Sequence, residues 1–198
     1  MTKPERSITA TARRAQIMAA TVDVIAEVGY AQTSFARIAE RAGLSSTRLI
    51  SYHFANKEEL MSSVAEDVIS SMGRFMTARL APLTSATDKL AAYLEGTAAY
   101  IADNRARMVA LTDIFLAGAL DYDADRDAVV VSPLEAILRQ GQADGEFRDF
   151  DPAVMAVVVQ RAVDGLPFLL QATPDLDCAH YARELVTLFR LATRREPA

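Results

Sequence analysis

The stretch "TSFARIAERAGLSSTRLISYHFANKEEL", residues 33–60, decides the fold prediction. Apolar residues recur at helical spacing in "FARIAERA", a glycine follows, and a second short helical segment leads to "YHF". Thr33 or Ser34 is expected to cap the first of these helices. Ser45 is expected to cap the second, which should end near Phe54. Two short helices joined by a glycine turn are typical of the helix-turn-helix motif.

Helical periodicity continues on both sides of this stretch, and no segment shows the sustained alternation of a strand. The preceding helix is expected to run from Thr9 or Thr11 to Val28, with Gly29 as its C-terminal cap. Asn56 is the expected cap of the following long helix. The sequence therefore predicts an all-α chain. Its later helices are expected over residues 56–80, 88–102, 105–120, 126–143, 152–171 and 177–194.

Charge is distributed unevenly along the chain. Residues 1–57 contain eight Lys and Arg against four Asp and Glu, whereas the whole chain of 198 residues has a net charge of −5. The first segment therefore carries +4 and the remainder −9. A basic head on an acidic body suggests that the head meets a polyanion, although chance clustering gives the same pattern.

The second helix of the motif carries the side chains that a DNA-reading helix needs. Hydroxyl residues at its start let the backbone approach phosphate, and Arg48 is a long donor suited to a bidentate contact with guanine. Tyr52, His53 and Lys57 can donate to phosphates at its far end, and Leu49 is the expected inward anchor. The alternative is that the tyrosine lies partly in the core and the histidine is packed or solvated. The hydroxyl residues are Ser45, Ser46 and Thr47.

Residues 33–60 resemble the DNA-binding head of the TetR (tetracycline-repressor) family of bacterial transcription regulators. That family carries a similar threonine, an "IA..AG" pattern, a short helix ending in "YHF", and a lysine followed by acidic residues. The resemblance implies that Thr33 starts the first of the two short helices, which is the second helix of the chain, and that it contacts phosphate. It also assigns residues to the recognition helix and to the DNA backbone contacts at its end. These residues are Ser45, Thr47, Arg48, Ser51, Tyr52, His53 and Lys57.

The stretch departs from the commoner family form by one additional residue between "AG" and "YHF". One residue turns a helix by about 100°. Either the turn absorbs this residue, or a different set of side chains faces the groove.

Over the whole chain, the resemblance implies a DNA-binding domain at residues 1–56 and a ligand-binding and dimerisation domain at residues 57–198. It implies a dimer formed by the last two helices, which would release a near-palindromic operator when a small molecule binds. The residues support such a dimer independently, because "VMAVVVQRAVDGLPFLLQA" is apolar almost all round and "YARELVTLFRLA" carries a broad apolar stripe. The alternative is that both helices are buried within one chain. The expectation that the protein represses rather than activates transcription rests only on what is usual for the family.

Met and aromatic residues of the middle helices are candidates for lining the ligand pocket, although residues at this spacing also form plain core. Asp113 and Asp164 stand in apolar runs, where either could meet a cationic ligand or point to solvent. The candidate lining residues are Met72, Phe75, Met76, Tyr93, Met108, Leu111, Thr112, Phe115, Leu138 and Phe168.

Other classes of protein fit the sequence less well. "DYDADRD", residues 121–127, lacks the glycine and the final glutamate of a calcium loop, and Cys178 with His180 gives too few ligands for zinc. No phosphate-binding glycine loop or nucleophile elbow is present, so no enzyme, cofactor or metal is expected. A helical interaction protein that does not bind DNA remains the alternative.

The expected compartment is the cytoplasm. A lone cysteine excludes a disulfide within one chain, which fits a reducing environment. The segment "MTKPERSITATARR" lacks the apolar run of a signal peptide. No stretch of about 18 apolar residues is free of charge, so no membrane span is expected.

Overall fold

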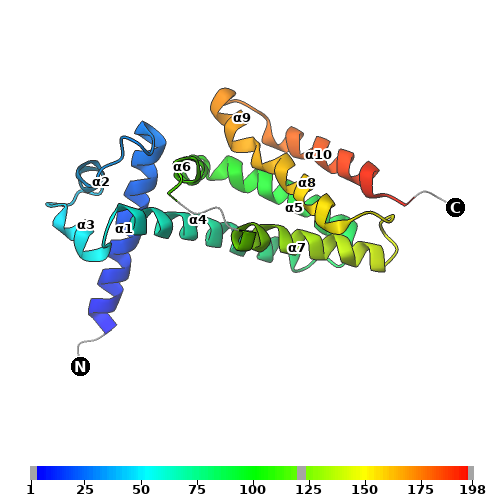
Figure 1. Cartoon of the computed structure of the whole chain (residues 1–198), viewed down its shortest axis with the longest axis horizontal. Coiled ribbons are helices and arrows are strands. Elements are labelled where there is room, and N and C mark those ends of the chain that lie inside the picture. Colours follow the sequence, from blue (N-terminus) through cyan, green and yellow to red (C-terminus); the bar gives the residue numbers. More distant parts are fainter. Residues whose placement is uncertain (1–3, 120–123, 196–198) are drawn as a thin grey trace. The chain divides into compact units, whose positions relative to one another are not determined.

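The structure, a computed structural model, describes residues 4–119 and 124–195. Every regular element of these residues is a helix, and the only strand-like pairing among them is an isolated bridge between Phe147 and Arg194 (Figure 1). The predicted all-α fold is confirmed. The helices are α1 (Pro4–Val28), α2 (Phe35–Arg41), α3 (Arg48–His53), α4 (Lys57–Leu80), α5 (Ala86–Asp103), α6 (Arg105–Leu116), α7 (Ala124–Ala143), α8 (Pro152–Asp164), α9 (Leu166–Ala172) and α10 (Cys178–Thr193).

Two of the predicted helix ends are confirmed by their capping geometry. Gly29 has φ 79°, a conformation that glycine adopts without steric cost, and its N–H donates to the carbonyl of Ile25 at 2.8 Å. The Asn56 side chain accepts from the N–H of Glu59 at 2.8 Å at the start of α4. Residues 121–123 of the expected acidic loop lie outside the described residues.

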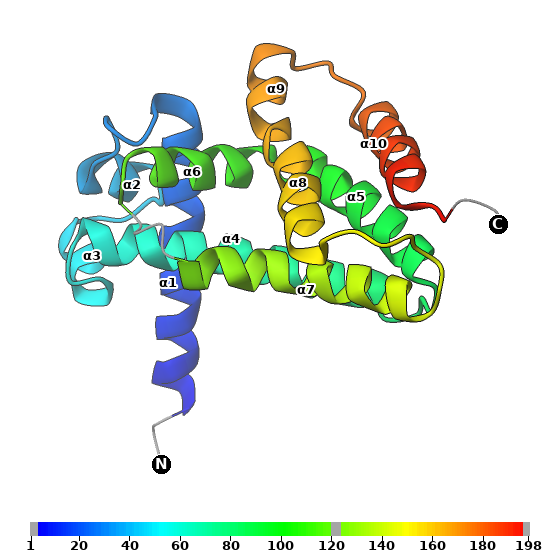
Figure 2. The same cartoon turned by 45° about the vertical axis from the view of Figure 1, so that its right-hand side comes forward.

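The prediction of one helix over residues 152–171 is wrong. The structure has two helices, α8 and α9, which meet at Gly165 (Figure 2). Pro167, in the first turn of α9, has no N–H to continue the hydrogen bonding of α8. The proline therefore starts a new helix, although apolar residues predominate on both sides of the break.

The chain forms two compact units. The first contains Met1–Ser70 and Arg105–Asp121, and the second contains Ser71–Asn104 and Tyr122–Ala198. Helix α4 passes from the first unit to the second after Ser70. The functional boundary between residues 56 and 57 stays a prediction.

The first unit is built around α1, which contacts α2, α3 and α6. Each of these helices contributes an isoleucine that is fully buried, and such side chains typically contribute about 1.5–3 kcal/mol each. These residues are Ile17 and Ile25 of α1, Ile38 of α2, Ile50 of α3 and Ile114 of α6. Helix α6 therefore shares a core with the helix-turn-helix segment, although some 50 residues separate them in sequence.

The second unit has its own core, in which α5 packs against α10 and α7, and α7 packs against α8. Leu94 of α5, Leu134 of α7 and Val159 of α8 are fully buried, and Phe189 of α10 is 4% exposed. One apolar cluster therefore joins all four helices.

The loop between α7 and α8 ties the ends of α5 and α10. The Glu146 carboxylate accepts hydrogen bonds from the Ser85 hydroxyl and from the N–H groups of Ala86 and Thr87, at 2.7–2.9 Å. The bond from the Thr87 backbone and those from the other two residues lower the pKa of the Glu146 carboxyl from 4.5 to about 2. The backbone N–H of Arg148 donates to the carbonyl of the last residue of α10 at 2.9 Å.

The same loop is anchored on a bare stretch of α7 backbone. A Cβ atom at Gly141 would lie 2.2 Å from the ring of Phe147 and 2.9 Å from the Cβ of Ala86. The Phe147 ring is 4% exposed, and its backbone N–H donates to the Gly141 carbonyl at 3.0 Å. Only glycine leaves room for this ring.

Candidate nucleic-acid interface

The turn after α2 is longer than predicted. Gly43 has φ 64°, and the N–H of Leu44 donates back to the carbonyl of Ala39 at 2.8 Å, which closes α2. Helix α3 then begins at Arg48 rather than at Ser45, so the prediction of Ser45 as its cap is wrong. The residues between them form the turn, which favours the alternative that the turn absorbs the additional residue.

The face that α3 turns inward also differs from the prediction. Ile50 is fully buried, whereas Leu49, the expected anchor, is 37% exposed. Adjacent residues of a helix point about 100° apart, so α3 turns the position next to the predicted one toward the core. Tyr52 is 82% exposed, which excludes a place in the core of this chain. The exposed predicted contacts are Ser45, Thr47, Arg48, Ser51 and Tyr52.

Arg14 of α1, which the sequence analysis did not single out, holds the end of α3. Its guanidinium donates to the carbonyl of His53 and to the Ser63 hydroxyl at 3.2 Å, and lies 4.1 Å from the centre of the Phe54 ring. The same group is 3.7 Å from the Glu59 carboxylate. One arginine thus joins α1, α3 and α4. Its place on the otherwise apolar inner side of α1 was the only signal in the sequence.

Two of the predicted phosphate contacts are also held by the protein itself. The Lys57 ammonium lies 3.2 Å from the carbonyl of Tyr30 and 4.2 Å from the centre of its ring, which leaves further N–H donors on the ammonium. Thr33 is 3% exposed, and its hydroxyl donates to the carbonyl of Gly29 at 2.8 Å. The cap of α2 is Ser34, the second predicted candidate, which accepts from the N–H of Arg37.

Eight of the nine predicted DNA contacts have exposed or half-exposed side chains. Ser46 and His53 are half-exposed, and the Ser46 hydroxyl accepts from the N–H of Arg48 at 3.2 Å. His53 packs edge-on against Tyr52, with ring centres 5.1 Å apart. Thr33 is the exception, because its side chain is buried.

The predicted ligand residues fall in both compact units. Met108, Leu111, Thr112 and Phe115 lie on α6 in the first unit. The other six lie in the second unit, and three of these belong to its buried core. The core residues are Met76, Tyr93 and Leu138, and the remainder are Met72, Phe75 and Phe168. Phe168 is 46% exposed on α9.

A chain of polar side chains crosses the core of the second unit. The Tyr93 hydroxyl donates to Gln160, whose amide donates to the Asp164 carboxylate at 2.6 Å. Burial, and then the charge of Asp164, raise the pKa of Tyr93 to about 12. Asp164 also pairs with Arg161 at 2.7 Å. One turn along α5 from Tyr93, the hydroxyl of Thr97 is buried without a hydrogen-bond partner.

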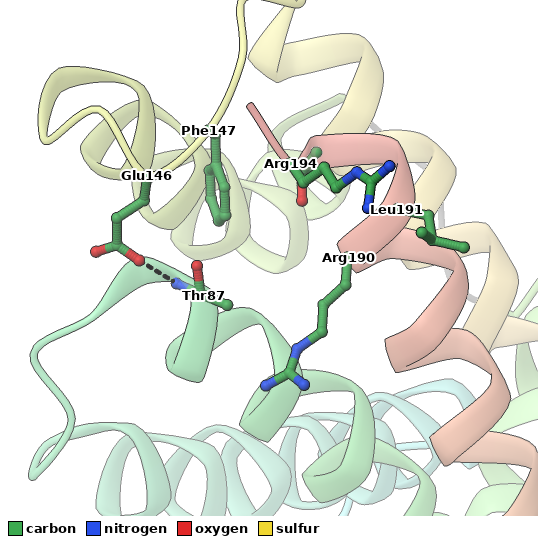
Figure 3. A pocket seen from close by; sticks show the side chains of 7 residues that line it. Thr87, Glu146, Phe147, Arg190, Leu191 and Arg194 are labelled. Carbon is green, nitrogen blue, oxygen red and sulfur yellow. Dashed lines mark hydrogen bonds between the residues drawn. The ribbon is translucent and has the colours of Figure 1, made fainter. Parts of the chain in front are cut away.

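Two surface pockets lie on the second unit, and none of the ten predicted ligand residues lines either of them. The first encloses about 290 Å³, with Glu146 and Thr87 on one side and Arg190 and Arg194 on the other (Figure 3). The second, of about 400 Å³, is an apolar groove along α8 and α10. Its lining residues are Phe150, Asp151, Val154, Met155, Val158, Leu188, Phe189 and Ala192.

The groove belongs to a larger exposed apolar surface, here called the α8–α10 face. Its side chains are 40–60% exposed on this chain. Pro152–Ala172 is also long and apolar enough, by length and composition, to cross a membrane, but it includes the break at Gly165 and 39% of its apolar window is buried. The residues of the α8–α10 face are Val154, Val157, Val158, Leu188 and Leu191.

A glycine turn between two short helices, with hydroxyl and arginine side chains exposed on the second, defines a helix-turn-helix DNA-binding protein. Residues 17–64 match the family model described as "Bacterial regulatory proteins, tetR family". The match covers about the C-terminal half of α1, the helix-turn-helix segment and the first residues of α4.

The chain is also similar to one curated relative and to two solved structures. The HTH-type transcriptional regulator BetI of Klebsiella pneumoniae (strain 342) is 38% identical over 86 residues, which cover 42% of this chain and 44% of BetI. The match therefore spans less than half the length of that relative. A tetR-family protein from Rhodococcus RHA1 aligns with a TM-score of 0.80 at 22% identity, covering 93% of this chain and 98% of its own. AibR, in complex with isovaleryl coenzyme A and operator DNA, aligns with a TM-score of 0.76 at 19% identity, covering 89% and 97%. At these identities the two structures show the shared fold alone.

Proposed function

We propose that the chain is a ligand-responsive transcription regulator. In this proposal it binds a near-palindromic operator as a homodimer, represses transcription, and is released from DNA by a small molecule in the cytoplasm. The observation that carries the proposal is the exposed surface of α3, where Arg48, Ser51 and Tyr52 stand beside the exposed turn before it. AibR, which shares the fold, was solved in complex with isovaleryl coenzyme A and operator DNA.

The exposed side chains divide by chemistry into base-reading and phosphate-binding groups. Arg48, the first residue of α3, carries the guanidinium suited to a guanine edge in the major groove. Tyr52, His53 and Lys57 supply donors for phosphates, which position a protein on DNA without reading its sequence. Thr33 acts in this proposal through the turn that its hydroxyl holds, and not through direct contact with phosphate.

A second copy of the chain is the proposed partner of the α8–α10 face. Leu188 and Leu191 are 56% and 58% exposed, which is unusual for leucines on neighbouring turns of one helix. Two copies related by a two-fold axis would cover this face and its groove with one another. Their two α3 helices would then read half-sites whose centres lie about 34–36 Å apart, or a multiple of this.

The proposed ligand is a small, largely apolar molecule bound in the second unit. Met76, Tyr93 and Leu138 belong to the core cluster of that unit and come from three helices, α4, α5 and α7. The buried hydroxyl of Thr97 is the group that a polar ligand atom would satisfy, because a buried hydroxyl without a partner is costly. Helix α4 begins beside α3 and continues into the second unit, so a tilt within that unit would be transmitted along it.

A gel-shift titration with the DNA upstream of the protein's own reading frame tests the proposal. The wild type should bind and protect paired half-sites in footprinting, and Arg48→Ala should lose preference for that site. Arg139→Ala is the matched control, because it removes an exposed arginine of α7 that pairs only within its own helix. A wild type that forms a dimer in light scattering but never shifts DNA would favour the helical interaction protein instead.

A further inference from the structure

The peptide group between Gly29 and Tyr30 is held from two sides. Its carbonyl, on Gly29, accepts from the Thr33 hydroxyl at 2.8 Å. Its N–H, on Tyr30, lies 3.4 Å from an Oδ atom of Asp113 on α6. A peptide group is planar, so it cannot rotate without breaking both contacts.

The next carbonyl along the chain, on Tyr30, holds two groups of the DNA-binding segment. It accepts from the Lys57 ammonium at 3.2 Å and from the N–H of Thr33 at 3.1 Å. The Lys57 ammonium also lies 4.2 Å above the Tyr30 ring. The position of this ammonium, just beyond the end of α3, therefore depends on the orientation of Tyr30.

Helix α6 is well placed to control this turn. It packs along α1 in the first unit, with Ile114 fully buried. Arg107, two turns before Asp113, pairs with Asp67 of α4 at 2.7 Å. Asp113 lies 3.7 Å from the position that a Cβ atom of Gly29 would occupy, so the carboxylate is closely fitted to the turn.

We propose that Asp113 is a positioning residue for DNA binding, which acts through Tyr30 on Lys57. By holding the Tyr30 N–H it fixes the carbonyl that orients the Lys57 ammonium toward phosphate. A displacement of α6 would release this turn and lower DNA affinity. The inference rests on the proposed function and adds the residue that links α6 to the recognition helix.

Because Asp113 is negatively charged, the direction in which its removal changes DNA affinity tests the inference. Removing a carboxylate from a DNA-binding head lessens repulsion of phosphate and by itself tightens binding. The positioning role predicts the opposite for Asp113→Ala. Glu66→Ala is the matched control, because Glu66 is an exposed carboxylate of α4 in the same compact unit.

The experiment measures affinity for the upstream DNA duplex by fluorescence anisotropy. Asp113→Ala should bind about three- to tenfold more weakly than wild type, which corresponds to the net contribution of one ordinary hydrogen bond. Glu66→Ala should bind equally or more tightly. Asp113→Asn should retain most of the affinity, since its amide oxygen can accept from the same N–H. It is measured in place of Asp113→Ala if the alanine variant does not fold.

A double-mutant cycle and hydrogen exchange separate this role from general destabilisation. If Asp113 acts through Lys57, then Asp113→Ala should cost little further affinity in a Lys57→Ala background. The Tyr30 amide should exchange faster in Asp113→Ala but not in Glu66→Ala, with or without DNA. Fully additive losses, or an Asp113→Ala variant that binds as tightly as Glu66→Ala, would overturn the inference. If wild type binds no DNA, both the proposed function and the inference fail, and the exchange result reports only on the turn.

Discussion

Alanine at Ile50 and at Leu49 tests which residue anchors α3. Ile50 is fully buried among the isoleucines of the first unit, and truncation of such a side chain costs about 2–5 kcal/mol. Leu49 is 37% exposed, so Leu49→Ala should cost about 1 kcal/mol or less. Since the two positions are adjacent, the difference reports the register of the helix and little else.

The measurement should report on the first unit by itself, because the chain has two compact units and no tryptophan as a local probe. Amide hydrogen exchange in α1 and α3 gives the free energy of opening of that unit. Ile50→Ala should accelerate exchange there by at least about fivefold more than Leu49→Ala, since a difference of about 1 kcal/mol corresponds to a factor of about five. Equal acceleration by the two variants would contradict the assignment of Ile50 as the anchor. A larger effect of Leu49→Ala would show that Leu49 is the anchor and that the assigned register is wrong.

Lys57→Ala and His53→Ala should weaken binding to all DNA sequences alike, and Lys57→Ala should reduce the slope of log K against log salt by about one; a change in base preference would contradict this. Glu146→Gln should lower stability at neutral pH by about 1–2 kcal/mol in thermal unfolding. The depressed pKa of Glu146 stabilises the fold above about pH 4.5, and this contribution is lost as the pH falls toward 2, so the variant should show a smaller loss of stability on acidification. Val158→Glu and Leu188→Glu should each convert the proposed dimer to a monomer in light scattering while the fold is retained, and dimers that persist would remove the α8–α10 face as the interface.

Much of the fold could be predicted because its signals are local. Helical spacing of apolar residues gives the helices, and Gly29 and Asn56 have the side chains that end and start them. The pattern of residues 33–60 likewise identified the helix-turn-helix segment and the family whose model residues 17–64 match.

Features set by packing could not be predicted in the same way. The start of α3 depends on how the turn after Gly43 closes, and three hydroxyl residues in a row each looked like a cap. The shift from Leu49 to Ile50 as the anchor followed from that error. The break at Gly165 did have a local signal, because Asp164 and Gly165 followed by Pro167 are typical of a helix end, but the apolar residues on both sides favoured one continuous helix.

Tertiary contacts of polar residues were also out of reach of the sequence. Nothing near Arg14 in the chain shows that it meets His53 and Phe54, almost 40 residues away. Asp113 was considered as a ligand contact or a solvated acid, and only the packing of α6 on α1 brings it to Tyr30. The ligand list combined helices that the structure divides between two units, so it stays a prediction.

The bare backbone at Gly141 has a consequence for how this protein can change during evolution. Even alanine there would displace the Phe147 ring, and with it the loop whose Glu146 and Arg148 hold the ends of α5 and α10. Helix α10 carries two of the five residues of the α8–α10 face, so a single added methyl group at Gly141 would alter a surface that it does not touch. A library of all single substitutions, selected for dimer formation, should therefore show Gly141 as intolerant as the exposed leucines of α10.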